Sequence, residues 1–141
     1  MGNLFKAWHK EVKCWIKCNP CVFQEGQIGR WNSNAPFDFF KAEDIEIVRN
    51  SGVKDTTGKE IYEGDIVEFY NDVDYVLHPG IAKVIFDLGA FQMENEKYGI
   101  DYLGNMDIDD MCIRVIGNIY ENPDLLKSKI EGEINGKSIW I

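Results

Sequence analysis

The sequence predicts a mainly β protein built on a meandering antiparallel sheet, with a minor helical part. Apolar and polar residues alternate through the central block, turn-forming residues separate the alternating stretches, and helix signals are few. Alternation is typical of half-buried strands, because successive side chains point to opposite faces of a sheet. With 141 residues, of which 45% are hydrophobic, the chain can bury a core without the help of a metal or a disulfide.

The first fifty residues are expected to be rich in strands. Residues 4–18 predict two strands around a polar turn near Lys10 and Glu11. Residues 35–48 are ambiguous, because their aromatic spacing partly suits a helix, whereas the final DIEIV alternates as a strand does. Both interpretations of that stretch remain open from the sequence.

Two glycines, Gly58 and Gly64, punctuate the stretch DTTGKEIYEGDIV at residues 55–67. A phosphate-binding loop would continue from Gly-Lys through Ser or Thr into a helix. Here Lys59 is followed by Glu60 and by a strand-like pattern. We therefore expect both glycines to form sharp corners of a sheet in the left-handed backbone conformation.

The strand that follows these corners is the clearest in the sequence. In DIVEFY, Val67 and Phe69 share one face, and Glu68 and Tyr70 share the other. The next ten residues, NDVDYVLHPG, predict a polar loop or an irregular extension of the strand.

Three more elements are expected before the tail. Residues 82–87 and 90–94 alternate around Gly89 and predict a hairpin, and residues 112–120 predict another strand. A short C-terminal helix should begin at NPDLL, where Asn122 would cap it and proline would take the first helical position. In the tail, residues 127–141, an Asn-Gly pair indicates a small hairpin.

Charge is concentrated in the central block. Residues 51–126 hold five Lys/Arg and sixteen Asp/Glu, a net charge of −11, within a chain of net charge −9. Such a block repels phosphate backbones, so direct nucleic-acid binding is not expected. A local basic patch is the one feature that favours it, and it comprises Lys6, Lys10, Lys13 and Lys17.

The sequence favours a cytoplasmic protein with no membrane segment. Its apolar runs are too short to cross a bilayer, and lysines interrupt the N-terminal stretch before a secretion signal could form. Lys6 stands where an N-myristoylation motif needs Ser or Thr.

Three cysteines, Cys14, Cys18 and Cys21, are weak candidates for a metal site because of their C-x3-C-x2-C spacing. A fourth zinc ligand would have to come from His9, His78 or Cys112, none of which lies at a recognisable spacing. A redox role needs a helix after CNPC, and the following VFQEG is not helical in pattern. We expect reduced cysteines and no cofactor, with zinc as the alternative.

No set of residues indicates catalysis. The acidic stretch DIDD, residues 107–110, lacks a nearby base, and two histidines are too few to assign a Ser/His/Asp set. The sequence therefore predicts a protein that is not an enzyme, with no catalytic residue. Six aromatic residues could line a binding groove, but most should fill the core: Trp8, Trp15, Trp31, Tyr62, Phe69 and Tyr70.

Three stretches together resemble the YopX family, small proteins encoded mainly by bacteriophages and prophages of Gram-positive bacteria. They are NLFKAWHKEVKCW (residues 3–15), SGVKDTTGKEIYEGDIVEF (51–69) and RVIGNIYENPDLL (114–126). The chain departs from the family pattern at Ser51-Gly52-Val53, where Thr-Gly-Leu is usual, and in its cysteines and tail.

This resemblance implies a predominantly β structure with a small SH3-like barrel over residues 51–126. The remaining parts are then an N-terminal β-rich segment packed on that core (residues 1–50) and a tail (127–141). It also implies a phage or prophage origin and a place in the cytoplasm of a bacterial host. No functional residue carries over, because the role of the family is not established.

The sequence leaves three hypotheses for function. The favoured one is a non-enzymatic module that binds another protein, since the expected fold has binding precedent. The second is an acidic mimic of nucleic acid that occupies the basic cleft of a host DNA-processing enzyme. The third is a binding protein stabilised by zinc at its cysteines. A homo-oligomer formed through an unpaired sheet edge is a further expectation.

Overall fold

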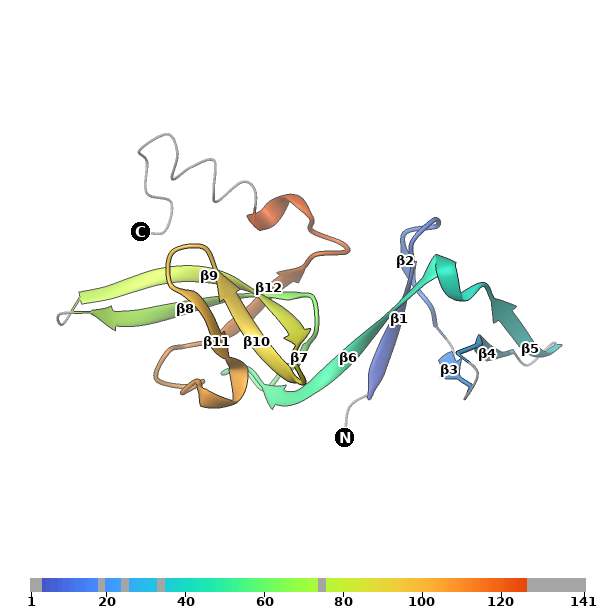
Figure 1. Cartoon of the computed structure of the whole chain (residues 1–141), viewed down its shortest axis with the longest axis horizontal. Helices are drawn as coiled ribbons and strands as arrows, with labels where there is room; N and C mark the ends of the chain where they lie inside the picture. The colour runs from blue at the N-terminus through green and yellow to red at the C-terminus, as the bar shows by residue number, and fades with distance from the viewer. Residues whose placement is uncertain (1–3, 18–19, 24–25, 33–34, 74–75, 127–141) are drawn as a thin grey trace. The chain divides into compact units, whose positions relative to one another are not determined.

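The computed structural model describes residues 4–17, 20–23, 26–32, 35–73 and 76–126 (Figure 1). It is mainly β with antiparallel strands, which confirms the predicted fold class. The chain forms two compact units, Met1–Asn50 and Ser51–Ile141. The predicted hairpin in residues 127–141 lies outside the described part.

The first unit begins with a hairpin of β1 (Phe5–His9) and β2 (Cys14–Trp15), which confirms the two strands and the polar turn. β1 also pairs with the first half of β6 (Ile45–Lys54), antiparallel from Phe5↔Arg49 to His9↔Ile45. A separate three-stranded sheet follows the order β3-β4-β5, with β3 at Pro20–Val22, β4 at Ile28–Asn32 and β5 at Ala35–Phe40.

The ambiguous stretch 35–48 forms strands rather than an α-helix. β5 is followed by a single 3-10 turn, η1 (Ala42–Asp44), and then by β6. The strand interpretation of DIEIV is therefore confirmed. Apolar residues of both sheets meet in one small core: Ala7, Ile16, Ile28 and Ile45, with Phe40 and Ile47 packed against them.

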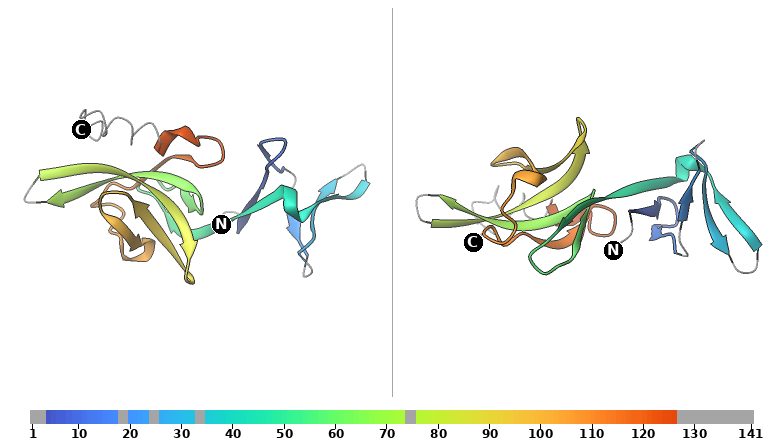
Figure 2. Two further views of the ribbon diagram at one scale, coloured as in Figure 1. Left: turned by 45° about the horizontal axis from the view of Figure 1, so that its top comes forward. Right: turned by 90° about the horizontal axis from the view of Figure 1, so that it is seen from below.

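The second unit is a five-stranded antiparallel sheet in the order β11-β10-β9-β8-β12, curled into a half-barrel (Figure 2). The strands are β8 (Asp65–Val73), β9 (Val76–Asp87), β10 (Ala90–Asn95), β11 (Gly99–Tyr102) and β12 (Arg114–Asn118). The short β7 (Glu60–Tyr62) pairs with β6, and a 3-10 turn, η2 (Leu103–Asn105), follows β11.

The core of this unit confirms the predicted alternation. In β8, Val67 and Phe69 are buried, whereas Tyr70 is 37% exposed. Ala82 and Val84 of β9 extend the same buried face. The remaining buried members of the cluster are Ile61, Met93, Leu103 and Ile113.

Both glycines of the stretch 55–67 adopt the left-handed backbone conformation that the sequence predicted, with φ of 88° at Gly58 and 85° at Gly64. Gly58 faces open space, but a Cβ on Gly64 would lie 2.7 Å from Cε2 of Tyr120. Gly58 therefore serves only the turn, whereas Gly64 also makes room for an aromatic ring.

Asp55 anchors the first of these turns. Its Oδ1 accepts hydrogen bonds from the Thr57 backbone N–H (2.8 Å), the Thr57 hydroxyl (2.7 Å) and the Lys59 N–H (2.9 Å). At the second corner, Oδ2 of Asp65 accepts from the N–H of Tyr62 at 2.8 Å. Both acids are buried, so these two carboxylates organise backbone rather than bind a ligand.

The described residues of the stretch NDVDYVLHPG, 71–73 and 76–80, extend the strands instead of forming a polar loop. β8 and β9 pair continuously from Ile66↔Lys83 to Val73↔Val76. Pro79 is tolerated because the N–H of its partner Tyr70 points away from β9, to the carbonyl of Met111 at 2.8 Å. Opposite residues of an antiparallel pair share this orientation, so the nitrogen of Pro79 also faces outward and no ladder bond is lost.

The hairpin predicted around Gly89 is confirmed, with Asp87 paired to Ala90. Leu88 and Gly89 both have positive φ, 50° and 79°, as a type I′ turn requires. The last strand is shorter than the predicted 112–120, because Cys112 has a φ of 49° and belongs to the preceding turn. A register shift between Val115 and Gly117 also interrupts the expected alternation of β12.

The chain turns into a helix where the sequence predicted, since residues 124–126 are helical. Asn122 has a different task from the predicted cap: its Oδ1 accepts the N–H of Asn118 at 3.2 Å and braces the preceding turn. Within the described residues, the helices are too short or too polar for any of them to traverse a lipid bilayer.

Candidate binding pocket

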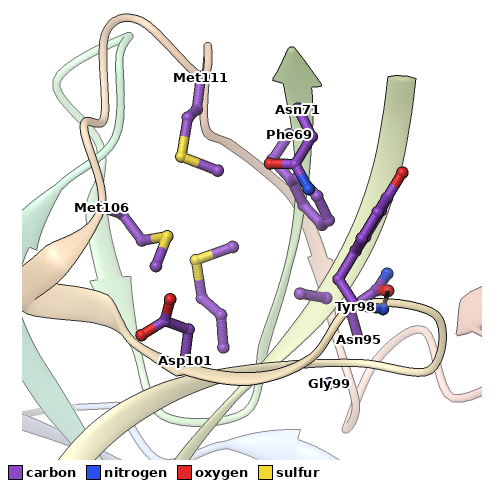
Figure 3. A pocket seen from close by; sticks show the side chains of 10 residues that line it. Phe69, Asn71, Asn95, Tyr98, Gly99, Asp101, Met106 and Met111 are labelled. Atoms are coloured by element: carbon purple, nitrogen blue, oxygen red, sulfur yellow. Dashed lines mark hydrogen bonds between the residues drawn. The ribbon is translucent and has the colours of Figure 1, made fainter. Parts of the chain in front are cut away.

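A pocket of about 100 Å³ opens on the inner face of the second unit (Figure 3). Its apolar wall consists of two aromatic rings and three thioethers: Phe69, Tyr98, Met93, Met106 and Met111. Figure 3 shows Met106 and Met111 on the side opposite Tyr98. We define these residues, together with the polar members described below, as the methionine pocket.

Phe69 is placed by the strand beside it. It pairs with Gly80 of β9, and a Cβ on Gly80 would lie 2.5 Å from Cζ of the Phe69 ring. The missing side chain lets the ring lie across β9, where it is only 3% exposed. Gly80 thus fixes the position of one pocket wall.

Tyr98 is positioned by the turn between β10 and β11. Asn95 is buried, and its Nδ2 donates to the carbonyl of Ile81 at 2.7 Å. Its Oδ1 accepts from the N–H groups of Lys97 (2.8 Å) and Tyr98 (2.7 Å). The ring of Tyr98 consequently meets Phe69 edge to face, with centroids 6.1 Å apart.

Met106 and Met111 belong to the loop between η2 and β12. The Met106 N–H donates to the carbonyl of Leu103 (3.1 Å), and the Met111 N–H donates to that of Asp107 (3.0 Å). The bond from the Tyr70 N–H to Met111 fastens this loop to β8. Thioether side chains are flexible and polarisable, so a wall of three methionines can adapt to its occupant.

Three polar side chains, Asn71, Asn95 and Asp101, lie among these apolar groups. Oδ1 of Asp101 accepts from the N–H of Tyr102 at 2.7 Å. The pocket lining of described residues contains no lysine, arginine or histidine. The charge of the pocket is therefore that of one exposed carboxylate, beside two neutral amides.

The two described cysteines of the C-x3-C-x2-C cluster proposed for zinc lie on different strands. Cys14 is exposed on β2 and Cys21 is half buried on β3, while Cys18 lies outside the described residues. Nδ1 of His9 accepts from the N–H of Val12 at 3.3 Å. Over the described part of the chain, no three His, Cys, Asp or Glu side chains converge as a metal site.

Two other suggested ligands, His78 and Cys112, lie on β9 and in the turn before β12, in the second unit. Neither lines the methionine pocket. The acids of the DIDD stretch shape their own loop: Oδ1 of Asp107 accepts from the N–H of Asp110 (3.1 Å), and Oδ1 of Asp109 accepts from the Thr56 hydroxyl (3.2 Å).

Two of the four lysines of the predicted patch, Lys6 and Lys10, make contacts within the first unit. Lys6 Nζ lies 4.5 Å from the ring centroid of Trp15. Lys10 Nζ donates to the carbonyl of Glu43 at 3.1 Å and forms an ion pair with Glu46 at 3.7 Å. Lys13 and Lys17 are exposed.

Of the six aromatic residues considered for a groove, Phe69 lines the pocket, and Trp8 and Tyr62 are buried elsewhere. The Trp31 side chain is not described. Sequence reasoning missed Tyr98, Asn71, Asp101 and the methionines. One signal was available: the chain has four methionines, and the three after Met1 all line this pocket.

Comparison with known proteins agrees with this architecture. The crystal structure of protein yopX from Bacillus subtilis has a TM-score of 0.63 at 22% identity, covering 89% of this chain and 97% of that chain. The crystal structure of protein EF1440 from Enterococcus faecalis has a TM-score of 0.59 at 24% identity, covering 86% and 96%. At these identities the likeness shows the fold alone.

Two sequence comparisons address the family of the chain. No curated protein matches it in sequence. The family model described as YopX protein matches residues 4–127, which include all of the described residues. The chain therefore belongs to the YopX family.

Proposed function

We propose that this protein is a non-enzymatic interaction module that binds a partner protein through the methionine pocket. The observation that carries the proposal is the make-up of the pocket, with three thioethers and two aromatic rings around one carboxylate and two amides. Such a surface offers adaptable apolar contact with a few polar groups that orient a ligand. Methionine and aromatic residues are also enriched at protein interfaces.

The size of the pocket supports a protein partner rather than a cofactor. Sites for small molecules and cofactors enclose roughly 300–1,000 Å³. The methionine pocket holds about 100 Å³, which suits one or two side chains of a partner. The family resemblance adds to the proposal a bacteriophage or prophage origin and action inside a bacterial host, which phage genes flanking this gene would support.

Quantitative affinity capture from bacterial lysate tests the proposal with two matched tyrosines. Tyr98 lines the pocket and is 39% exposed, whereas Tyr102 is 52% exposed on β11 and is not part of the lining. Proteins captured by the wild type and by Tyr102→Ala should be lost with Tyr98→Ala. Equal capture by all three forms, or capture of no protein by any of them, would refute the proposal.

A second candidate, an acidic mimic of nucleic acid, is favoured by the net charge of −11 over residues 51–126. Two of these acids, Asp55 and Asp65, are buried in turns, but most of the others lie at the surface, including Asp87, Glu96 and Asp110. Binding to a panel of DNA-processing enzymes should then weaken steeply between low and high salt. Absent or salt-insensitive binding would exclude this candidate.

A further inference from the structure

We propose that the methionine pocket selects one lysine side chain of its partner, with the ammonium group held by Asp101. This inference rests on the proposed function, because it names the ligand chemistry of the same pocket. Three properties of the pocket support it: its volume, its apolar lining and its charge.

The apolar wall suits an unbranched aliphatic stem. Met93, Met106 and Met111 surround a space of about 100 Å³, and Phe69 forms a further side. For scale, an apolar cavity of about 150 Å³ accommodates benzene. Flexible thioethers can close around a chain of methylene groups, and lysine buries its stem along such surfaces while its charge stays at the rim.

The charge of the lining selects a cation. Asp101 is the one carboxylate among the described lining residues, and these include no lysine, arginine or histidine. The ring of Tyr98 already attracts an ammonium group, because the Nζ of Lys97 lies 5.4 Å from its centroid. An anionic ligand would meet the carboxylate and the negative faces of the rings, so it would be repelled.

The geometry of Asp101 favours lysine over arginine. Its Oδ1 is engaged by the N–H of Tyr102 at 2.7 Å, which leaves Oδ2 without a partner among the described residues. A guanidinium group binds a carboxylate best through both oxygens, whereas an ammonium group acts as a point charge and needs only one. Asn71 lies across the pocket from Asp101 (Figure 3), so its amide is placed to contact another part of the partner rather than the same ammonium group.

Nuclear magnetic resonance of methionine methyl groups tests this inference on the full chain. The probes are n-butylammonium, which reproduces the lysine side chain, n-propylguanidinium, the neutral n-butanol and the anionic pentanoate. We expect n-butylammonium to shift the methyl signals of Met93, Met106 and Met111 saturably, while that of Met1 serves as the reference. The other three probes should bind at least several-fold more weakly.

Two matched variants test whether Asp101 is the group that binds the ammonium. Asp101→Asn keeps the oxygen that accepts from Tyr102 and should weaken n-butylammonium binding about tenfold, as expected for loss of one charge-assisted contact. Asp110→Asn removes the same charge from the neighbouring loop and should leave binding unchanged. Equal binding of n-butanol or pentanoate, no methyl shift with any probe, or an unaffected Asp101→Asn variant would overturn the inference.

The two proposals fail in different ways. If Tyr98→Ala abolishes partner capture but n-butylammonium does not bind, the lysine inference is wrong and the interaction module stands. If n-butylammonium binds as expected but capture is the same for Tyr98→Ala and the wild type, the proposed function of the pocket is wrong.

Discussion

Asp55 and Val115 are 60 positions apart, yet the Oδ2 of Asp55 accepts the N–H of Val115 at 3.0 Å. The other oxygen of this carboxylate holds the turn that begins the segment 55–67. One buried side chain therefore ties the first turn of the second unit to the start of β12. Both stretches belong to the motifs by which the sequence resembles the YopX family.

Replacing Asp55 by Ala should destabilise the second unit substantially. The substitution leaves the N–H groups of Thr57, Lys59 and Val115 without their acceptor, and each such loss costs about 1–3 kcal/mol. We expect a loss of at least about 2 kcal/mol in urea unfolding, with Asp55→Asn intermediate because it keeps one oxygen. A loss below about 0.5 kcal/mol for Asp55→Ala would contradict the anchoring role.

Asp55 should also make the free energy of unfolding depend on pH. Burial raises the pKa of Asp55, but hydrogen bonds from the Thr57 hydroxyl and the N–H groups of Val115, Lys59 and Thr57 outweigh burial, so the pKa lies below the ordinary 3.8. The folded state thus favours the charged form. This stabilisation is complete above pH 3.8 and is lost as the pH falls from there through the lowered pKa.

The measurement is the difference in unfolding free energy between the wild type and Asp55→Asn, followed from pH 6 to acid. The difference should be constant near neutrality and should shrink on acidification. A difference that does not change over this range would show that folding does not lower the pKa of Asp55.

Gly58 and Gly64 allow the cost of backbone strain to be separated from that of a clash. Both have φ near +85°, but only Gly64 faces a ring, that of Tyr120 at 2.7 Å. Gly58→Ala should cost about 1 kcal/mol, the strain of the left-handed conformation. Gly64→Ala should cost clearly more in urea unfolding. Equal losses would mean that Tyr120 moves aside freely.

Gly80→Ala should disturb the methionine pocket itself. The new methyl group would lie 2.5 Å from the Phe69 ring, so the ring has to leave its place against β9. Forced repacking of this kind costs about 1–3 kcal/mol, and the Met93 methyl resonance should shift. Gly104→Ala is the control, since a Cβ added at that position would have no atom within 4 Å. An unchanged Met93 signal in Gly80→Ala would count against this role of Gly80.

The first unit should fold without zinc. It has its own apolar core, and Cys14 is exposed. Protein purified without chelator should contain far less than one zinc per chain by elemental analysis, and Cys14→Ser should unfold at the same urea concentration as the wild type. One zinc per chain in the wild type, lost in Cys14→Ser, would instead establish a zinc site at the N-terminal cysteines.

Much of the fold was predictable because its determinants are local. The alternation in residues 65–70 and 82–87 and the turn glycines follow from neighbouring residues alone. The pairing of residues 71–73 and 76–80 was harder to predict. Their polar and apolar side chains do not alternate, although the backbone pairs as β8 and β9. The bulge in β12 depends on its register against β8, which no single segment specifies.

The pocket could not be predicted from the sequence, because its lining residues come together only in the folded sheet. Phe69 was assigned correctly to the inner face, but Met93, Met106 and Tyr98 come from different elements. Their meeting depends on the curl of the sheet and on the hydrogen bond that ties the Met111 loop to β8. Spacing along the chain carries no information about such convergence. Membership of the YopX family, in contrast, was correctly predicted from short motifs.

Pro79 has one more consequence, which concerns other copies of the chain. β10 pairs with β9 only over Lys83–Asp87, so the outer half of β9 presents a free margin among the described strands. A foreign strand that tried to extend the sheet there would meet an imino nitrogen where it needs a donor. This edge of β9 is therefore a poor template for edge-to-edge pairing with a second copy of the chain.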